Sequence, residues 1–323
     1  MSKAIRIHAH GGPEVLKWEQ VPTPQPGPNE ALIRHEAVGL NFIDIYFRTG
    51  LYKANLPSTL GMEGAGVVLA VGENVQNVAP GDRVAYAGGP LGAYSTERVI
   101  NAEKLVKLPE GIDTKTAGAM MLQGLTAYFL LHRTFKVQAG QTILVHAAAG
   151  GVGLILCQWA KHLGANVIGV VSSEAKAEIA RGNGAAHVIV GHTNLAAEVK
   201  QITSGAMVPV VYDSVGKDTF NASLDSLAPL GLMVSFGNAS GPIPPFDIAT
   251  LSTKGSLFLT RPGFSTYMST AQDISTGSTA LFSAVLSGAL HISVNQSFPL
   301  EDAATAHTAL EARKTTGSTV LIP

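Results

Sequence analysis

The sequence has almost no cysteine: among 323 residues, only Cys157 carries a thiol. One thiol can form neither an intrachain disulfide nor a cysteine-rich metal site, and such a chain is typical of a reducing compartment. The first residues, MSKAIRIHAHGGPE, also lack the apolar core of a signal peptide. We therefore expect a cytoplasmic protein.

Charge is also scarce. Charged residues make up 14% of the chain, and 22 Lys and Arg against 23 Asp and Glu leave a net charge of -1. Because there is no basic surplus and no charged run, nucleic acid is not an expected partner. A long clean apolar run is missing too, since His146, the three glycines within 150–153, Gln158 and Lys161 interrupt the most apolar stretch, 142–165. We expect no membrane span.

The length and the turn signals that are present predict two domains. About 120 N-terminal residues consist of short strand-like segments broken by Gly and Pro turns, with no long helical period before residue 115. This pattern is typical of a small β-barrel domain. The segment 114–135 then has apolar residues at the spacing of a helix.

Strands and helices alternate strictly after that helix. This alternation predicts a doubly wound parallel sheet covered on both faces, so the fold class is α/β. The expected strands are 142–146, 167–171, 187–190, 209–213, 231–236 and 254–260, and the expected helices are 152–163, 174–181, 195–203 and 218–228. The tail, 302–323, is expected to form a helix and a terminal strand that returns to the first domain.

A glycine-rich turn, AAAGGVG at 147–153, joins the first of these strands to the first helix. In a Rossmann unit, the glycines let the pyrophosphate of a dinucleotide approach backbone N–H groups at the N-terminus of the helix. A turn of this kind can also serve only to let helix and strand pack closely. The βα units that follow favour the dinucleotide, with Gly150 in the turn that faces the pyrophosphate.

The tip of the second strand indicates which dinucleotide binds. An NAD site places Asp or Glu there to bind the ribose hydroxyls. This chain has Ser172 and Ser173 at the tip and Lys176 in the following helix. Two hydroxyls and a cation suit a 2′-phosphate, so NADPH is the predicted cofactor. Glu174 is the one residue that argues against a 2′-phosphate, although a Glu in a first helical turn usually faces solvent.

Several blocks of the sequence resemble one known family. They are GLNFIDIYFRTGLY, GMEGAGVVLAVG, PGDRVAY, HAAAGGVGLILCQWAK, VVYDSVGKDTF, GLMVSFGNASGP and GSLFLTRP. These blocks are similar to the zinc-independent NADPH:quinone oxidoreductases, relatives of zeta-crystallin in the medium-chain dehydrogenase/reductase superfamily. The resemblance implies a GroES-like barrel over 1–122, completed by the tail 266–323, and a Rossmann NADPH-binding domain over 123–265. It also implies a homodimer that pairs through the edge strand 254–260.

The same blocks predict that no metal is bound. Zinc-dependent relatives carry Cys near the position of Asn41 and His in a GHE motif where this chain has Met62. Catalytic zinc needs three N, S or O ligands, and a thioether is a poor one. The other histidines are scattered without a metal-binding spacing.

Quinone reduction does not require a Lewis acid, because the product is an aromatic hydroquinone or its anion, and the protein mostly has to position the reactants. By resemblance, Asn41, Tyr46 and Tyr52 surround the nicotinamide and the substrate, where an amide and two phenols can stabilise a developing oxyanion. Tyr46 and Tyr52 could instead only pack the barrel wall.

Further cofactor contacts are implied by the resemblance alone. They include one stretch before the Rossmann domain, the loops after its strands, and one residue of the tail. The residues are Phe42, Ile43, Asp44, Ile45, Tyr46, Thr126, Phe129, Gly151, Val152, Ser214, Gly216, Phe236, Asn238, Ser240, Phe258, Leu259, Thr260 and Arg313, with Gly151 and Val152 at the pyrophosphate.

One departure from the family concerns the 2′-phosphate. Close relatives often have Tyr where this chain has Gly191, next to His192. If protonated His192 takes over that contact, NADPH should bind less tightly above about pH 6.5. The preference for NADPH over NADH is then less strict than in the family.

Two other functions fit the same sequence. One is a reductase of the activated C=C bond of 2-alkenals and enones on this scaffold. The other is a non-catalytic NADPH-binding protein of the crystallin type, including an RNA-binding one, which the absence of a basic patch disfavours.

Overall fold

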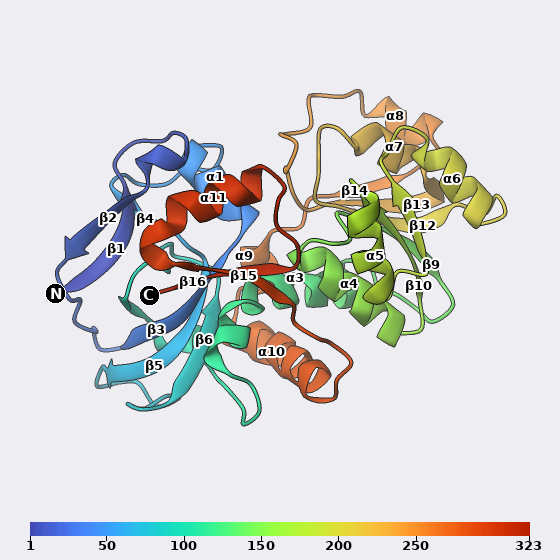
Figure 1. Ribbon diagram of the computed structural model, residues 1–323. Helices are drawn as coiled ribbons and strands as arrows, with labels where there is room; N and C mark the ends of the chain where they lie inside the picture. Colours follow the sequence, from blue (N-terminus) through green and yellow to red (C-terminus); the bar gives the residue numbers. More distant parts are fainter. The chain divides into compact units, whose positions relative to one another are not determined.

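The computed structural model describes residues 1–323 in full. The chain forms two compact units, each with its own sheets (Figure 1). The first unit contains residues 1–125, 268–287 and 292–323, and the second contains 126–267 and 288–291. The expected tail, 266–323, therefore lies in the first unit except for 266–267 and 288–291.

The first unit is built mainly from antiparallel strands. A three-stranded sheet has the order β2-β1-β4, and a larger one has the order β15-β16-β3-β5-β6-β8, with β7 paired to β3. The strands are β1 (Ser2–Ile7), β2 (Lys17–Val21), β3 (Glu30–Leu40), β4 (Ser58–Thr59), β5 (Glu63–Val71), β6 (Arg83–Ala87), β7 (Glu97–Asn101), β8 (Val106–Lys107), β15 (Val294–Pro299) and β16 (Ser318–Ile322). The helices are α1 (Phe42–Thr49), α2 (Thr114–Gly118), α10 (Ala271–Leu286) and α11 (Ala303–Glu311), with short 3₁₀ turns at Pro13–Val15, Ala102–Lys104 and Leu300–Asp302.

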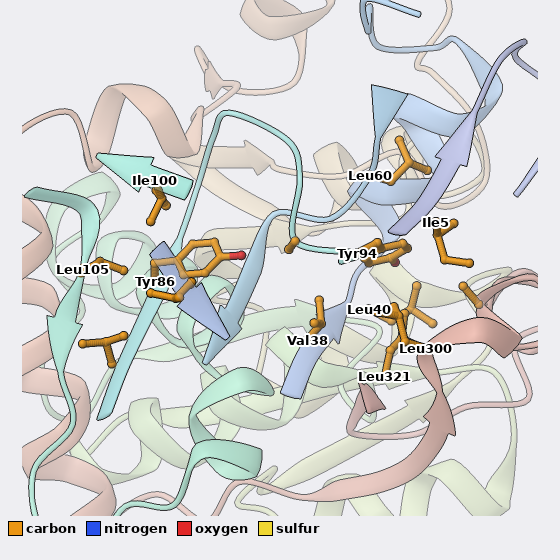
Figure 2. Close-up of a cluster of buried hydrophobic side chains, with 14 of the residues drawn as sticks. Ile5, Val38, Leu40, Leu60, Tyr86, Tyr94, Ile100, Leu105, Leu300 and Leu321 are labelled. Carbon is orange, nitrogen blue, oxygen red and sulfur yellow. The ribbon is translucent and has the colours of Figure 1, made fainter. Parts of the chain in front are cut away.

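The core of the first unit shows that the tail belongs to it. Strand β16 pairs antiparallel with β3, with Val320 opposite Gly39, which confirms the predicted return of the terminal strand. Figure 2 shows Leu300 and Leu321 from the tail beside Leu40 from β3. These side chains are almost fully buried, and burying each contributes about 1.5–3 kcal/mol.

Helix α1 was not expected from the sequence, which shows no long helical period before residue 115. Its eight residues are too few to show a period, but its end signals are present. The Asp44 carboxylate accepts a hydrogen bond from the Asn41 N–H at 2.9 Å, and Gly50 ends the helix with φ 82°. Only glycine adopts that backbone conformation without strain.

The helical spacing over 114–135 does correspond to helical structure, but the helix is interrupted. The segment consists of α2, then α3 (Met121–Phe129), then a π-helical turn at Leu130–Thr134. Gly118 ends α2 where a Cβ would lie 2.8 Å from the Ala37 carbonyl oxygen, so the chain passes very close to β3. The break gives α3 a new N-terminus, and its Leu122 N–H donates to the Glu63 carboxylate at 2.8 Å.

The second unit has one parallel sheet in the order β11-β10-β9-β12-β13-β14. This is the doubly wound order of a Rossmann fold, so the predicted fold class is confirmed. The strands are β9 (Thr142–His146), β10 (Asn166–Val171), β11 (His187–Val190), β12 (Val208–Asp213), β13 (Leu227–Ser235) and β14 (Phe258–Thr260). The helices are α4 (Gly151–His162), α5 (Glu174–Gly182), α6 (Leu195–Ile202), α7 (Phe220–Asp225), α8 (Ala249–Thr253) and α9 (Phe264–Tyr267).

Three element boundaries in this unit differ from the prediction by three or more residues. Helix α7 ends at Asp225 rather than 228, and β13 begins at Leu227 rather than 231, with a positive φ of 61° at Leu230 within the strand. Strand β14 starts at Phe258 rather than 254, because Gly255 and Ser256 turn the chain with φ of 113° and 56°. None of the helices combines the length and the apolar character that crossing a membrane requires.

Candidate functional site

The carboxyl edge of the parallel sheet gathers most of the predicted cofactor residues of the second unit. Each parallel strand ends at the same edge, and this is where ligands bind in doubly wound folds. Segments from all six strands contribute: Gly150, Gly151 and Val152 follow β9; Ser172, Ser173 and Lys176 follow β10; His192 follows β11; Ser214 and Gly216 follow β12; Phe236, Asn238 and Ser240 follow β13; and Phe258, Leu259 and Thr260 form β14.

The glycine turn after β9 has the shape of a phosphate cradle. Gly150 is the N-cap of α4, and a Cβ there would meet only the Ala147 carbonyl oxygen at 3.2 Å. At Gly153, by contrast, a Cβ would lie 2.2 Å from the same oxygen, so this glycine allows helix and strand to approach closely. The two glycines therefore serve different purposes. The open side of Gly150 and the N-terminal N–H groups of this 12-residue helix fit a dinucleotide pyrophosphate.

The tip of β10 carries hydroxyls and a cation. Ser173 caps α5, its Oγ accepting the Lys176 N–H at 3.4 Å, while Ser172 is exposed. Glu174 is exposed in the first turn of α5. No carboxylate ends the strand itself, so the residues present fit a 2′-phosphate better than free ribose hydroxyls.

The departure from the family, Gly191 beside His192, lies at the end of β11. Gly191 has a φ of 85°, and no atom lies within 4 Å of the position of a Cβ there. The neighbouring His192 is exposed. The position of the family's Tyr is therefore open, and the imidazole next to it is accessible to a phosphate group.

A buried aspartate shapes the loop after β12. Asp213 Oδ1 accepts hydrogen bonds from the N–H groups of Val215 and Gly216 at 2.8 and 3.0 Å, and its Oδ2 accepts from Thr219 at 2.7 Å. Gly216 has a φ of 94°. The carboxylate thereby fixes the loop that contains Ser214 and Gly216, both predicted as cofactor contacts.

Ser240 links this loop to the loop after β13. Its Oγ donates to the Val215 carbonyl at 2.9 Å and accepts from the Asp218 N–H at 3.0 Å. The predicted cofactor residue Ser240 therefore has a structural role in the free protein. Phe236 and Asn238 on the same loop are half-buried.

His146 and Ser223 extend the Asp213 cluster. Ser223 Oγ donates to Asp213 Oδ2 at 2.7 Å and lies 2.9 Å from His146 Nε2. Burial lowers the pKa of His146, and nearby Asp213 opposes that shift. All three side chains are buried, so this cluster stabilises the carboxyl edge of the sheet rather than presenting a nucleophile.

The predicted contacts on α3 and β14 differ in exposure. Phe129 is buried and its ring stacks on Tyr267, with centroids 4.6 Å apart, whereas Thr126 is half-buried. Leu259 and Thr260 are half-buried, but Phe258 is 60% exposed. Of these residues, Phe258 is the most accessible to a partner molecule.

In the first unit, the predicted nicotinamide residues begin α1. Phe42 and Ile43 are half-buried, while Asp44, Ile45 and Tyr46 are buried. The Tyr46 ring lies 6.3 Å from that of Phe42 and 5.2 Å from that of Tyr52 (centroid distances). The Tyr52 N–H also donates to the Tyr46 carbonyl at 3.0 Å. The structure therefore brings Tyr52, which follows α1, against Tyr46 on the helix that Asn41 caps.

The Asn41 amide is held on both sides by buried side chains. Its Nδ2 donates to Glu63 Oε1 at 2.6 Å, and its Oδ1 accepts from Gln123 Nε2 at 3.1 Å. Ser318 Oγ then donates to Gln123 Oε1 at 2.7 Å. Burial raises the pKa of Glu63 to about 8, against the lowering effect of its hydrogen bonds. The network joins the link between β3 and α1, where Asn41 lies, to β5, α3 and the returning tail strand.

Asp44 belongs to a second buried network. Its Oδ2 accepts from Tyr94 Oη at 3.0 Å; that hydroxyl lies 3.0 Å from His307 Nε2, and Arg48 donates to His307 Nδ1 at 3.1 Å. Burial raises the pKa of Asp44 to about 7 and lowers that of His307 to about 3. The other carboxylate oxygen of Asp44 is buried without a hydrogen-bond partner. Asp44 thus faces its own unit.

Arg313 follows α11 in the first unit, where it is exposed and has a φ of 57°. It therefore lies in a different unit from the glycine turn and the β10 tip, where the other predicted phosphate contacts lie.

The residues at the expected zinc position do not fit a metal ion. Nowhere in the chain do three or more His, Cys, Asp or Glu side chains come together in a way that could hold one. Met62 and Asn41, where the resemblance places the ligands of zinc-dependent relatives, are a thioether and an amide, and Cys157 is buried in α4. Burial raises the pKa of that thiol to about 12, which opposes the thiolate form that binds metal.

Four residues of these buried networks escaped the analysis of the sequence: Glu63, Gln123, Ser318 and Asp213. Gln123 gave a local signal, since it is a polar residue in the apolar run AGAMMLQGL. Glu63 stands in the GMEG block, and Asp213 ends an apolar strand. Their partners are distant in sequence, so no local spacing could have joined them.

Comparison with known proteins agrees with this architecture. The family described as alcohol dehydrogenase GroES-like domain matches residues 27–110, and the one described as zinc-binding dehydrogenase matches residues 151–290. Both belong to the medium-chain dehydrogenase/reductase architecture of a barrel followed by a Rossmann domain.

Relatives match over the full length. The quinone oxidoreductase of Pseudomonas aeruginosa is 54% identical, with 100% of both chains covered. The 2-haloacrylate reductase of a Burkholderia species is 47% identical, over 100% of this chain and 99% of the relative. A crystal structure of Escherichia coli quinone oxidoreductase complexed with NADPH is 47% identical with a TM-score of 0.97, over 99% of this chain and 100% of that one. The chain therefore belongs to the quinone oxidoreductase family of the medium-chain dehydrogenase/reductase superfamily.

Proposed function

We propose that this protein is an NADPH-dependent quinone reductase that works without a metal. The observation that carries the proposal is the full-length similarity to quinone oxidoreductases, including one whose structure contains NADPH. The glycine turn and the β10 tip support it independently, because their geometry suits a dinucleotide with a 2′-phosphate.

Residues of the second unit would hold the cofactor. The N–H groups at the start of α4 would bind the pyrophosphate beside Gly150, Gly151 and Val152. Ser172, Ser173 and Lys176 would bind the 2′-phosphate, with His192 as an additional cation when protonated. The loops after β12 and β13, which Asp213 and Ser240 hold in place, would lie along the nicotinamide ribose.

Residues of the first unit would act on the acceptor. Bound NADPH supplies a hydride, and a quinone that receives it develops negative charge on oxygen. Asn41 retains one amide N–H after its bond to Glu63, and this donor can stabilise that oxygen. The phenols of Tyr46 and Tyr52 would border the quinone ring and could donate similarly. Phe42 would pack against the nicotinamide.

The test is a rapid-mixing assay. The protein is mixed with NADPH and with a small para-quinone or ortho-quinone, and the loss of NADPH absorbance is followed. We expect turnover with at least one quinone, slower with NADH than with NADPH. If no quinone oxidises NADPH at micromolar protein, the proposed function is wrong. An Asn41→Asp variant, which lacks the amide donor, should bind NADPH but turn over slowly.

A second function is tested in the same assay, since a 2-haloacrylate reductase is 47% identical over the full chain. Reduction of an activated C=C bond also leaves negative charge on a conjugated oxygen, so the same Asn41 donor would serve it. Quinone, 2-alkenal and 2-haloacrylate are compared at equal concentration, and the highest kcat/KM identifies the activity. Tight NADPH binding without turnover of any acceptor would instead indicate the non-catalytic role.

We also infer a cytoplasmic homodimer. The support is the edge position of β14, where Phe258 is 60% exposed, and the exposed Leu230 (67%) on the neighbouring strand β13. An exposed edge strand with apolar side chains is a template for pairing with a second copy. Light scattering after size exclusion gives the mass of the particle. We expect two chains for the natural protein and one for Phe258→Glu; a natural protein of one chain contradicts this.

A further inference from the structure

The buried series of hydrogen bonds around Asn41, called the chain below, has one donor-to-acceptor direction. Ser318 donates to Gln123, Gln123 donates to Asn41, and Asn41 donates to Glu63, at 2.7, 3.1 and 2.6 Å. Each amide has one end that donates and one end that accepts, so the chain can run in this direction or in reverse, but not in a mixture. All four residues are buried and lie in the first unit.

Glu63 determines which direction is adopted. Its Oε2 accepts the Leu122 N–H at 2.8 Å, and the Met121 N–H also bonds to this carboxylate. These N–H groups are the unpaired donors at the start of α3, so the carboxylate acts as the cap of that helix. It has little room to move, because Gly39 packs against it where a Cβ would lie 2.2 Å from Oε1. An ionised carboxylate only accepts, so Asn41 must turn its NH₂ group toward it.

The direction matters for the chemistry of Asn41. In the observed direction, one N–H of Asn41 Nδ2 remains available beyond its bond to Glu63. If the chain ran in reverse, nitrogen and oxygen would exchange places, and the remaining N–H would move by the width of the amide group. A donor displaced by even 1 Å can cost about 10²-fold in rate.

We propose that Glu63 is a positioning residue for the reaction: by accepting from Asn41 while anchored to the start of α3, it fixes the amide with its N–H toward the developing oxyanion. This inference rests on the proposed quinone reduction, in which Asn41 is the donor. Gln123 and Ser318 support the same orientation. Gln123 donates to the oxygen of the Asn41 amide, and Ser318 donates to Gln123 and so holds its amide in the matching orientation.

The proton on Glu63 provides a first readout. Asp44, Tyr86 and Tyr94 are close enough to influence its charge, and His35 packs against the adjacent Gly64. Burial raises the pKa of Glu63 to about 8. Because the Leu122 N–H occupies Oε2, an added proton on Oε1 would donate to Asn41 and permit the reverse direction. We therefore expect kcat of the natural protein to rise with pH through about 8.

The Glu63→Gln variant is designed to reverse the donor direction of this series of hydrogen bonds while it keeps the shape of the side chain at position 63. The backbone N–H groups of α3 require an oxygen, so the new amide must turn its NH₂ group toward Asn41. Asn41 would then present its oxygen to that introduced amide and its NH₂ group to Gln123, which in turn would donate to Ser318. We expect kcat at pH 9 to fall about 10²-fold, the effect of losing an oxyanion donor, with no pH rise through 8.

Gln123→Glu completes a cycle that separates positioning from stability. Alone, it places carboxylates on both sides of Asn41, both of which require the NH₂ group, so the urea midpoint should fall. Combined with Glu63→Gln it satisfies every hydrogen bond in the reverse direction, so the urea midpoint should recover while kcat stays low. Glu30→Gln is the matched control, because Glu30 also accepts a backbone N–H, from Gly27 at 2.9 Å, but does not contact Asn41.

Each outcome either supports or overturns the positioning role of Glu63. Recovery of the urea midpoint with a persistently low kcat, and an NADPH Kd within about two-fold of the natural protein, supports the proposal. A kcat of Glu63→Gln equal to that of the natural protein at pH 9, or a double variant that regains both stability and kcat, overturns it. If the natural protein itself reduces no quinone, the proposed function fails and this inference falls with it.

Discussion

The glycine turn after β9 allows the sharpest prediction, because one methyl group has opposite expected effects at two positions three residues apart. At Gly153 a Cβ would lie 2.2 Å from the Ala147 carbonyl oxygen and 2.9 Å from Ala148 Cα, where ordinary contact begins at 3.4 Å. Both neighbours are backbone atoms that cannot rotate away. The turn and α4 would have to separate by the difference between 3.4 and 2.2 Å, which is 1.2 Å.

At Gly150 the same methyl group meets only the Ala147 carbonyl oxygen at 3.2 Å, which is 0.2 Å short of ordinary contact at 3.4 Å. Its φ of -85° is one that alanine adopts freely. Replacing a glycine N-cap by alanine costs at most about 1 kcal/mol. The methyl group therefore remains compatible with the fold but occupies space that we assign to the pyrophosphate.

The two variants should therefore separate stability from binding. We expect Gly153→Ala to lower the free energy of unfolding by about 2–3 kcal/mol, as overpacked cores do. We expect Gly150→Ala to change it by less than about 1 kcal/mol but to raise the NADPH Kd at least about tenfold, which corresponds to about 1.4 kcal/mol. Gly182→Ala is the control, because no atom lies within 4 Å of a Cβ at the exposed end of α5.

Urea denaturation followed by tryptophan fluorescence gives the free energy of unfolding, and titration calorimetry gives the NADPH Kd. Gly150→Ala that folds normally and binds NADPH as the natural protein does would refute the assignment of the pyrophosphate to the start of α4. Gly153→Ala with unchanged stability would show that the turn does not need this glycine for packing.

Further predictions concern charge. Lys176→Ala should raise the NADPH Kd about tenfold and leave the NADH Kd unchanged, since only NADPH carries the 2′-phosphate; equal effects on both cofactors in calorimetry would contradict this. Burial lowers the pKa of His307 from 6.5 to about 3, so the unfolded state binds its proton first, and stability should fall as pH drops from 6.5 toward 3. Urea midpoints that stay constant over that range exclude the effect. For Glu63 the pKa is raised from 4.5 to about 8, so the folded state binds the proton more tightly and stability should fall as pH rises between these values. Glu63→Gln should flatten that part of the urea-midpoint profile, and an unchanged slope would assign it to another group.

The sequence alone determined the features that depend on local order. Apolar strands alternating with helices fix a parallel sheet, and a glycine turn between the first strand and helix fixes where a phosphate can approach, because neighbours in the chain make both. The absence of a carboxylate at the β10 tip was equally readable. End signals for α1 were also there, although the helix is too short to show a period.

Only the tertiary structure decided how Asn41 is oriented. Its amide depends on Glu63, Gln123 and Ser318, and the last two, 195 residues apart in the chain, meet only because β16 pairs with β3 beside α3. The break between α2 and α3, which turns two N–H groups toward Glu63, follows from close packing of Gly118 on β3 rather than from helix propensity. Hydrogen bonds between buried groups that are distant in the chain produce no local pattern in the sequence. Their partners come within reach only when the strands pair.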